Sequence, residues 1–387
     1  MKDSARRIAP RVAIPALPCV LRAAGLLLAT TLLASCKFGD LGSKQQATLG
    51  TEGLWIANGT NVVEYVPDQM VAGSTAGTPH LTLSSAEFGS PQGVRFDAGG
   101  NLWVLDSAGM INGAATPAIF GFSPSQVTAL GTNSAPDPVT VITSTALKDP
   151  QQSVFDPQGN QWVTDHDSNT ILVFTAGQLA QTNLNISPAV IISSTALNGP
   201  VGLAFDSTGN LWVANNGAVP QSNGASSSAG TTIVEFAASL LPAPPVTGIL
   251  TPDLKPTLTL SDDGASSIQG PWALRFDADG NLWTGNALSS TLVAFAASNL
   301  SSTGSPSPVA ILSSTTLNST ASLEAPHGLC FDDQGNLVAV SSGGAFGVAL
   351  YGKSQLTTGS PTPDTLFVGS STHLSKPQGC VFGPAIM

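Results

Sequence analysis

Histidines with nearby carboxylates are the residues of this chain whose types and spacing fit acid–base or metal chemistry. His327 lies three residues after Glu324, His166 directly follows Asp165, and His373 lies in a loop near the end of the chain. Imidazole titrates near neutral pH, and both group types bind metals. His327 is therefore a candidate catalytic acid or base, and Glu324, His166 and His373 are candidate ligands for a divalent calcium or zinc ion. The alternative for His327 is a hydrogen-bonded side chain lining a channel.

Polar residues recur at the end of apolar segments of the type Leu-Trp-Val. These residues are Asn58, Asp106, Asp165, Asn215, Asn286 and Ser341. Carboxylate and amide oxygens bind calcium or polar ligands, so the Asn and Asp residues are ligand-binding candidates. The alternative is structural, because Asn and Asp also cap the turn that follows a strand.

A sequence repeat contains the segments that must position these residues. GPVGLAFDSTGNLWVANN, residues 199–216, recurs from residues 90, 149, 270 and 325, and a copy that begins at residue 376 is cut short. The second half of that copy starts at residue 52. Four short apolar segments per copy predict four strands in each of six repeats. We therefore expect an all-β fold, a six-bladed β-propeller over residues 52–387 with four antiparallel strands per blade, closed by pairing of its N- and C-terminal strands.

Two further repeated features have structural interpretations. Asp-x-x-Gly-Asn follows the first strand of five copies, and the bidentate Glu of a calcium loop does not follow it. We interpret it as a hairpin turn. A tryptophan recurs in the second strand of five copies, where a large apolar side chain is expected to pack between blades.

Strand direction brings the start of each first strand and the end of each second strand to one face. The residue after the proline at the start of each first strand, followed by Gly in four of the six copies, should then lie at the mouth of the central channel. These residues are Gln92, Gln151, Val201, Trp272, His327 and Gln378. They are predicted to form an inner ring of ligand-binding candidates, and the Asn and Asp residues a wider ring. Deeper in the first strands, Arg95 and Arg275 should face each other across the ring. We expect them to pair with carboxylates; the alternative is contact with an anionic ligand.

The pattern Pro-x-Gly-x-x-Phe-Asp-x-x-Gly-Asn-Leu-Trp-Val resembles NHL-type repeats and the six-bladed gluconolactonase and regucalcin-like enzymes. The resemblance covers nearly all of residues 51–387 and implies the propeller fold. It also implies a divalent metal at the channel mouth, held by Asn or Asp between Pro and Gly and by a Glu two residues before such a proline. Glu324 matches that Glu, but no Asn or Asp stands between Pro and Gly in any of the six copies.

The start of the chain has the pattern of an export signal. A basic segment precedes the apolar run LLLATTLLAS, which ends at Cys36. Residues 33–36, Leu-Ala-Ser-Cys, resemble a bacterial lipobox. This implies that residues 1–35 are a cleaved signal peptide, that Cys36 is lipidated, and that residues 36–51 form a linker. Lys37 rather than Asp follows, so the expected location is the outer membrane, facing the periplasm or the surface. The alternatives are an ordinary signal peptide and an uncleaved anchor.

Charge narrows the function classes. The chain has a net charge of −11, and residues 36–387 contain 8 basic and 23 acidic residues, whereas a nucleic-acid-binding domain needs a basic surface. The leading prediction is a monomeric, non-catalytic lipoprotein that binds an envelope protein or a small molecule at the channel mouth. The second is a metal-dependent lactonase, hydrolase or lyase that uses His327. The third is an architectural subunit of an envelope complex.

Two cysteines, Cys330 and Cys380, fall in first strands of neighbouring copies, one residue out of phase. Period-2 alternation places them on opposite faces of their strands. We expect two buried free thiols; the alternative is a disulfide between neighbouring blades, which export permits.

Overall fold

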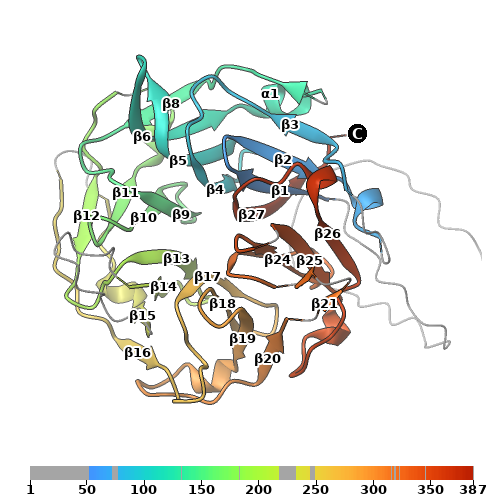
Figure 1. Ribbon diagram of the computed structural model, residues 1–387. Coiled ribbons are helices and arrows are strands. Elements are labelled where there is room, and N and C mark those ends of the chain that lie inside the picture. The colour runs from blue at the N-terminus through green and yellow to red at the C-terminus, as the bar shows by residue number, and fades with distance from the viewer. Residues whose placement is uncertain are drawn as a thin grey trace, which may run out of the picture. The chain divides into compact units, whose positions relative to one another are not determined.

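Six β-sheets stand around a central channel in chain order, as the blades of a propeller (Figure 1). The computed structural model describes residues 52–71, 77–131, 133–182, 184–217, 232–244, 249–314, 316–317, 320–321, 323–344 and 346–386. Within each blade, successive strands pair antiparallel. The predicted all-β, six-bladed propeller is confirmed. The expected signal peptide, Cys36 and nearly all of the linker lie outside the described residues.

Each blade has four strands, counted from the channel outward. The inner strands are β4 (Pro91–Phe96), β9 (Pro150–Phe155), β13 (Pro200–Phe205), β17 (Pro271–Phe276), β23 (Pro326–Phe331) and β27 (Pro377–Pro384). The second strands are β1 (Glu52–Asn58), β5 (Leu102–Ile111), β10 (Gln161–Asp165), β14 (Leu211–Asn215), β18 (Leu282–Asn286) and β24 (Leu337–Ser341). The third strands are β2 (Asn61–Tyr65), β6 (Ala114–Phe122), β11 (Thr170–Phe174), β15 (Thr232–Phe236), β19 (Thr291–Phe295) and β25 (Gly347–Tyr351).

The outer strands are β3 (Leu81–Leu83), β8 (Thr140–Thr143), β12 (Val190–Ser193), β16 (Leu258–Ser261), β20 (Ala310–Ser313) and β26 (Thr365–Val368). Three short additions are β7 (Asn133–Ser134), which pairs with β3, and the two strands of a small hairpin, β21 (Thr316–Leu317) and β22 (Thr320–Ala321).

The ring closes between strands from the two ends of the propeller. β27 pairs antiparallel with β1, so that Cys380 lies opposite Ile56 and Phe382 opposite Leu54. In Figure 1 the red β27 lies beside the blue β1 within one sheet. The inner edge of β1 is thereby paired instead of exposed, and closure by the terminal strands is confirmed.

The Asp-x-x-Gly-Asn segments are hairpin turns, as predicted. Asp277 accepts hydrogen bonds at Oδ1 from the backbone N–H groups of Asp279 and Asn281, at 3.0 and 2.9 Å. Its Oδ2 accepts from Asn281 Nδ2 and from Trp283 Nε1, both at 2.9 Å. Gly280 has a φ of +80°, which favours glycine. Indole donation to the turn recurs at Asp97, Asp156 and Asp206.

The repeated tryptophans pack against the next blade. The ring of Trp162 contacts Phe205 edge-on, with centroids 5.6 Å apart and planes at 85°. Equivalent pairs are Trp55–Phe96, Trp103–Phe155, Trp212–Phe276 and Trp283–Phe331. Each such pair contributes about 0.5–1.5 kcal/mol beyond burial. The predicted packing between blades is confirmed.

The glycine of the Pro-x-Gly segment, present in four of the six copies, lies where neighbouring inner strands approach each other. A Cβ atom at Gly93 would lie 2.6 Å from the carbonyl oxygen of Gln151 in the next blade. Gly328 faces the carbonyl of Gln378 in the same way. Glycine therefore lets the inner strands pack around a narrow channel.

A short helical turn joins the third and fourth strands in each of the six blades, where the sequence predicted only a turn. These segments are η1 (Pro67–Gln69), α1 (Pro124–Thr128), α2 (Ala176–Leu179), η2 (Ala238–Leu240), η3 (Ala297–Asn299) and η4 (Lys353–Gln355); η5 (Ser370–Thr372) precedes β27. In α1, Ser123 and Gln126 form a capping box. The turn buries one apolar side chain, Val127, against the blade.

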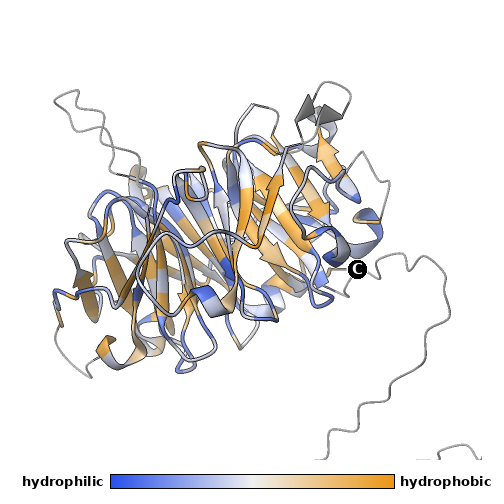
Figure 2. Cartoon of the chain, turned by 90° about the horizontal axis from the view of Figure 1, so that it is seen from below, coloured by the Kyte–Doolittle hydropathy of each residue, from blue (hydrophilic) through white to orange (hydrophobic). Residues whose placement is uncertain are grey.

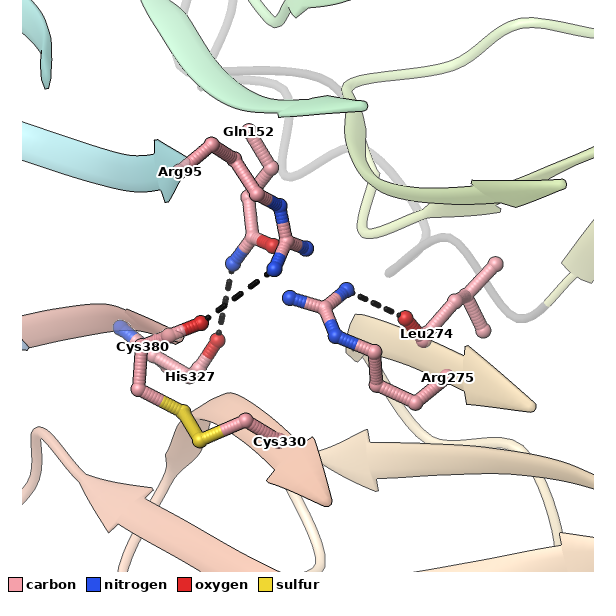
Figure 3. Close-up of a disulfide and its surroundings, with 7 residues drawn as sticks. All are labelled: Arg95, Gln152, Leu274, Arg275, His327, Cys330 and Cys380. Atoms are coloured by element: carbon pink, nitrogen blue, oxygen red, sulfur yellow. Dashed lines mark hydrogen bonds between the residues drawn. A yellow bond between two sulfur atoms is a disulfide. The ribbon is translucent and has the colours of Figure 1, made fainter. Parts of the chain in front are cut away.

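Cys330 and Cys380 form a disulfide with their Cα atoms 6.0 Å apart (Figure 3). The prediction of two free thiols is therefore wrong, and the alternative is confirmed. β23 and β27 are inner strands of neighbouring blades, so side chains on opposite faces of the two strands point at each other across the blade interface. The disulfide links the last complete blade to the blade that closes the ring.

Apolar residues are concentrated in the strands and polar residues in the loops on both sides of the ring (Figure 2). The core lies between the faces of adjacent blades, where each cluster combines strands of two neighbouring sheets. Among the described residues we find no helix with the length and apolar character needed to span a membrane.

Candidate functional site

The strand register places both predicted rings at one end of the channel, which we call the Pro-x-Gly face. The proline that begins an inner strand pairs with the residue that ends the second strand, as in Pro271 opposite Asn286 and Pro91 opposite Asp106. Of the inner ring, the partly exposed members are Gln92, Trp272, His327 and Gln378. The remaining two, Gln151 and Val201, are buried. The surface that a ligand can reach is therefore restricted to part of the predicted ring.

Trp272, His327 and Gln378 form a contact chain across three blades. The rings of Trp272 and His327 stack with centroids 3.7 Å apart and an interplanar angle of 7°. His327 Nδ1 lies 2.7 Å from Gln378 Oε1, so the imidazole donates to the amide oxygen. Burial lowers the pKa of His327 to about 4, although the hydrogen bond to Gln378 acts in the opposite direction. The imidazole is neutral at neutral pH, which corresponds to the hydrogen-bonded, channel-lining alternative.

The wider ring has a structural role instead of the predicted ligand contact. The side chains of Asn58, Asp106, Asp165, Asn215 and Asn286 are completely buried. Their oxygens accept hydrogen bonds from the backbone that leads into the inner strand of the same blade. These oxygens are used within the fold, which agrees with a structural role, although most of the backbone that they hold leads into the inner strand instead of following the second strand.

Asp106 and Asn215 illustrate this role. Asp106 accepts from the backbone N–H groups of Gly89 and Ser90 at 2.9 and 2.8 Å. Asn215 accepts from Asn198 N–H at 3.0 Å and donates to the Ala196 carbonyl at 2.8 Å. Each side chain thus fixes the loop that sets the channel mouth.

The three candidate histidines belong to three different blades. His166 follows β10, His327 lies in β23, and the exposed His373 precedes β27 in a left-handed conformation with a φ of +55°. Within the described residues, the ligand atoms of His327, His373 and Glu324 do not enter a common cluster of three metal-binding groups. The structure does not bring the predicted metal ligands together.

His166 instead belongs to a cluster with Asp149 and Asp167, which we call the Asp149 triad. Its Nδ1 lies 3.0 Å from Asp167 Oδ1 and 3.7 Å from Asp149 Oδ2. One ligand atom from each residue fits within a set no wider than 4.8 Å. Asp149 precedes β9 and His166 follows β10, so the triad lies on the Pro-x-Gly face, beside the channel mouth.

The electrostatics of the Asp149 triad favour a cation. Burial and, after it, the charge of Asp167 raise the pKa of Asp149 to about 6, against the opposing effect of His166. Two carboxylates and one imidazole form a mixed oxygen and nitrogen donor set, which suits zinc better than calcium. The arrangement has the geometry to hold a divalent ion with open coordination positions.

Asp149 escaped the sequence analysis because it is the first residue of its repeat copy, a position at which the other copies have Ser, Gly, Ala or Lys. The sequence did contain a signal for this contact. In each repeat, the loop before the inner strand lies at a fixed distance along the chain from the end of the second strand, and the hairpin between them brings the two together. The hairpin brings Asp149 next to His166 through a backbone hydrogen bond of 3.0 Å between His166 N–H and the Asp149 carbonyl.

The channel mouth does not fit the metal implied by the resemblance. Its inner ring offers amides, an indole, a stacked imidazole and Val201 where carboxylates or asparagines would be needed. A separate cavity of about 1000 Å³ opens on the opposite face, between the blades of β9 and β13, and includes Trp162, Phe205 and Leu241.

Comparison with known proteins gives the fold. No protein-family profile matches the sequence. No curated protein is significantly similar to it. Among solved structures, a protein of unknown function from Bacteroides caccae has a TM-score of 0.55 at 10% identity, covering 87% of this chain and 100% of its own.

Two further solved structures carry the same architecture. The nidogen/laminin complex gives a TM-score of 0.53 at 14% identity over 86% of this chain and 98% of that one. The periplasmic gluconolactonase of Pseudomonas aeruginosa gives 0.51 at 14% identity over 87% of this chain and 99% of that one. The likeness confirms the expected resemblance to gluconolactonase-like and NHL-type propellers at the level of the fold.

Proposed function

We propose that the protein is a lipid-anchored envelope propeller that binds an envelope protein or a small molecule at the Pro-x-Gly face without converting it. The observation that carries this proposal is the stacked pair of Trp272 and His327, fixed by Gln378. A rigid, uncharged surface with aromatic and amide groups suits recognition of a polar, uncharged ligand group. A histidine whose pKa is about 4 is poorly matched to general base catalysis near neutral pH.

The proposed anchor is the lipidated thiol of Cys36, with the propeller as a monomer held off the outer membrane by residues 37–51. Its test is the substitution Cys36→Ser. The expected result is loss of labelling by a radioactive fatty acid and release of the chain from the membrane fraction. Unchanged labelling and membrane association would remove the anchor from the proposal.

Binding is tested with the soluble Cys36→Ser chain as bait for envelope extracts and small-molecule extracts. The variant Trp272→Leu removes the indole and keeps an apolar side chain, and His327→Gln keeps a hydrogen-bonding group. We expect both variants to lose about tenfold or more in affinity for whatever the bait retains, because both groups face the ligand.

The matched control is Gln158→Ala, which removes an exposed side chain from a turn on the opposite face. It should retain full affinity. If all three variants bind equally well, the ligand site lies elsewhere on the molecule. Far-UV circular dichroism of each variant separates lost binding from lost folding.

A metal-dependent lactonase, hydrolase or lyase is the second candidate, and the Asp149 triad favours it. A divalent ion there would be held by Asp149, His166 and Asp167, and would polarise a carbonyl group or activate water. The test is metal analysis of the protein after dialysis against zinc or calcium. Bound metal at one equivalent, absent in Asp149→Asn, supports this candidate; metal-free wild-type protein ends it.

A further inference from the structure

Arg95 and Arg275 are the only arginines in residues 36–387, and both point into the central channel. Arg95 lies in β4 and Arg275 in β17, which belong to blades on opposite sides of the ring. In Figure 3 their guanidinium groups approach each other across the channel. The side chain of Gln152 lies beside them and donates to the His327 carbonyl at 3.2 Å, so it connects β9 with β23.

The two guanidinium groups use few of their donors. Arg95 donates from Nε to the Ser153 carbonyl at 2.8 Å and from Nη1 to the Cys380 carbonyl at 3.5 Å. Arg275 donates from Nη1 to the Leu274 carbonyl at 2.6 Å. A guanidinium group has five N–H donors, so most donors of the pair remain available to a further acceptor.

The expected pairing with carboxylates is not found. Among the residues that the structure describes, no Asp or Glu oxygen lies within 4.0 Å of either guanidinium group, since the ion pairs present involve only His166. The nearest repeated carboxylates in sequence, Asp97 and Asp277, spend both oxygens on their own hairpin turns. Two like charges therefore face each other in an acidic protein without a counterion among the described residues.

The pair lines a cavity of about 400 Å³ at the end of the channel opposite the Pro-x-Gly face. The other walls are apolar and include the phenylalanines that end four inner strands. These are Phe96, Phe155, Phe205 and Phe276. The volume exceeds that of a cavity that admits benzene, about 150 Å³. The space thus combines a cationic centre with an aromatic rim.

Enclosure of Arg95 has a measurable consequence. Burial lowers the pKa of Arg95 to about 10. A lowered pKa is expected of a guanidinium group that has lost contact with solvent without gaining an anionic partner. An anion bound between the two groups would reverse this shift and relieve their mutual repulsion.

We propose that this cavity, which we call the channel arginine site, binds a small carboxylate with an apolar body. The carboxylate would accept hydrogen bonds from Arg95 and Arg275, and the apolar part would contact the four phenylalanines. Planar guanidinium groups match carboxylates with paired hydrogen bonds. The site lies at the other end of the channel from the proposed ligand face and is independent of the proposed function.

The test is calorimetric titration of the Cys36→Ser chain with sodium benzoate in chloride-free buffer, together with thermal denaturation. We expect benzoate to bind at one equivalent and to raise the melting temperature. Arg275→Gln should weaken binding by about tenfold or more, because it removes a charge-assisted contact. Arg95→Gln should do the same, and the double variant should not bind.

Lys353→Gln is the matched control, since it removes one positive charge from an exposed position away from the channel; it should leave binding unchanged. Inorganic phosphate, titrated in parallel, should bind more weakly than benzoate because it leaves the aromatic rim empty. Absence of benzoate binding to wild type, or equal binding to the double variant, overturns the channel arginine site. Phosphate binding as tight as benzoate binding would contradict the prediction that the ligand has an apolar body. Arg275→Gln gives up only one hydrogen bond to its own strand, so it tests the site even if Arg95→Gln does not fold.

Discussion

Residues from three blades determine the position and the protonation state of the His327 side chain. Trp272 stacks on its ring, Gln378 Oε1 accepts a hydrogen bond from its Nδ1–H, and its backbone carbonyl accepts one from the Gln152 amide. Desolvation outweighs the hydrogen bond in fixing its protonation state. A histidine that the sequence presents as a candidate catalyst is thus, in the fold, a neutral part of the channel wall.

The depressed pKa of His327 predicts acid sensitivity. Between about pH 6.5, the ordinary pKa of histidine, and about pH 4, the pKa of His327 in the fold, the unfolded chain binds a proton that the folded chain does not. Stability should therefore fall as the pH is lowered through this range, by about 2–3 kcal/mol. His327→Gln should lack this component. Urea denaturation of both proteins at pH 7.5 and pH 4.5 measures it, and parallel pH profiles would contradict the assignment.

Glu64 in β2 predicts the opposite pH dependence. Its side chain is buried, accepts from Ile386 N–H at 2.9 Å through Oε1, and leaves Oε2 without a hydrogen-bond partner. Burial raises its pKa from 4.5 to about 7. The folded chain holds this proton where the unfolded chain has lost it, so stability falls as the pH rises from about 4.5 to 7.

Glu64→Gln imitates the protonated carboxyl group and should stabilise the protein at pH 8 by about 2–3 kcal/mol, with little change at pH 4.5. Glu52→Gln provides a control at the start of the neighbouring strand. Chemical denaturation at the two pH values decides the matter: an equal effect of Glu64→Gln at both would show that Glu64 is not the titrating group.

At the scale of elements, the inner hairpin is the unit that the sequence specifies best. Its turn, its glycine and its tryptophan each act through contacts that lie close in the chain or repeat in every blade. The strand pattern could therefore be predicted from periodicity alone. The sequence did not predict the short helical turns after the third strands because their N-cap residue differs from copy to copy, for example Ser123, Ala237 and Gly352.

Asp277→Ala tests the importance of the turn network. It removes four hydrogen bonds, among them the one from the buried Trp283 indole. We expect a loss of about 2–4 kcal/mol, since a buried indole N–H would be left unsatisfied. The control is Asp279→Ala in the same turn, whose side chain is exposed; it should cost less than about 0.5 kcal/mol. Equal losses in thermal denaturation would refute the structural role of Asp277.

The candidate site was harder to predict than the hairpin because it depends on contacts between blades. Spacing along the chain located the Pro-x-Gly face, but it did not reveal that Asn215 and its equivalents are buried or that Asp149 meets His166. Alternation placed Cys330 and Cys380 on opposite faces of their strands. The two side chains can form a disulfide because those strands are adjacent inner strands of neighbouring blades, which alternation alone does not reveal.

At the scale of the whole molecule, stability depends on ring closure. β27 supplies the inner strand of the first blade, and the disulfide fastens it to β23. The bond closes a segment with a sequence separation of 50 residues. Restricting the unfolded chain in this way is typically worth about 2–4 kcal/mol.

Cys330→Ser combined with Cys380→Ser should lower the unfolding free energy by about that amount, and wild-type protein in a reducing buffer should behave similarly. Guanidinium denaturation under oxidising and reducing conditions measures both. If the double variant is as stable as oxidised wild type, the disulfide does not hold the ring closed.

The two ends of the channel have different chemistry. The Pro-x-Gly face is neutral and aromatic at its centre with the Asp149 triad beside it, whereas the opposite end has Arg95 and Arg275 behind an aromatic rim. Gln152 lies beside the arginines and donates to the His327 carbonyl, so it links the two regions. One propeller thus offers two binding surfaces that can be tested independently.

The central claim is that ligand recognition occurs on the Pro-x-Gly face. Hydrogen–deuterium exchange of the Cys36→Ser chain, with and without the ligand or partner that the capture experiment retains, tests it most directly. We predict slowed exchange in peptides spanning residues 90–93, 270–273, 325–328 and 376–379, with the hairpin turns on the opposite face unchanged. Slowed exchange confined to those turns or to the outer strands would contradict the claim.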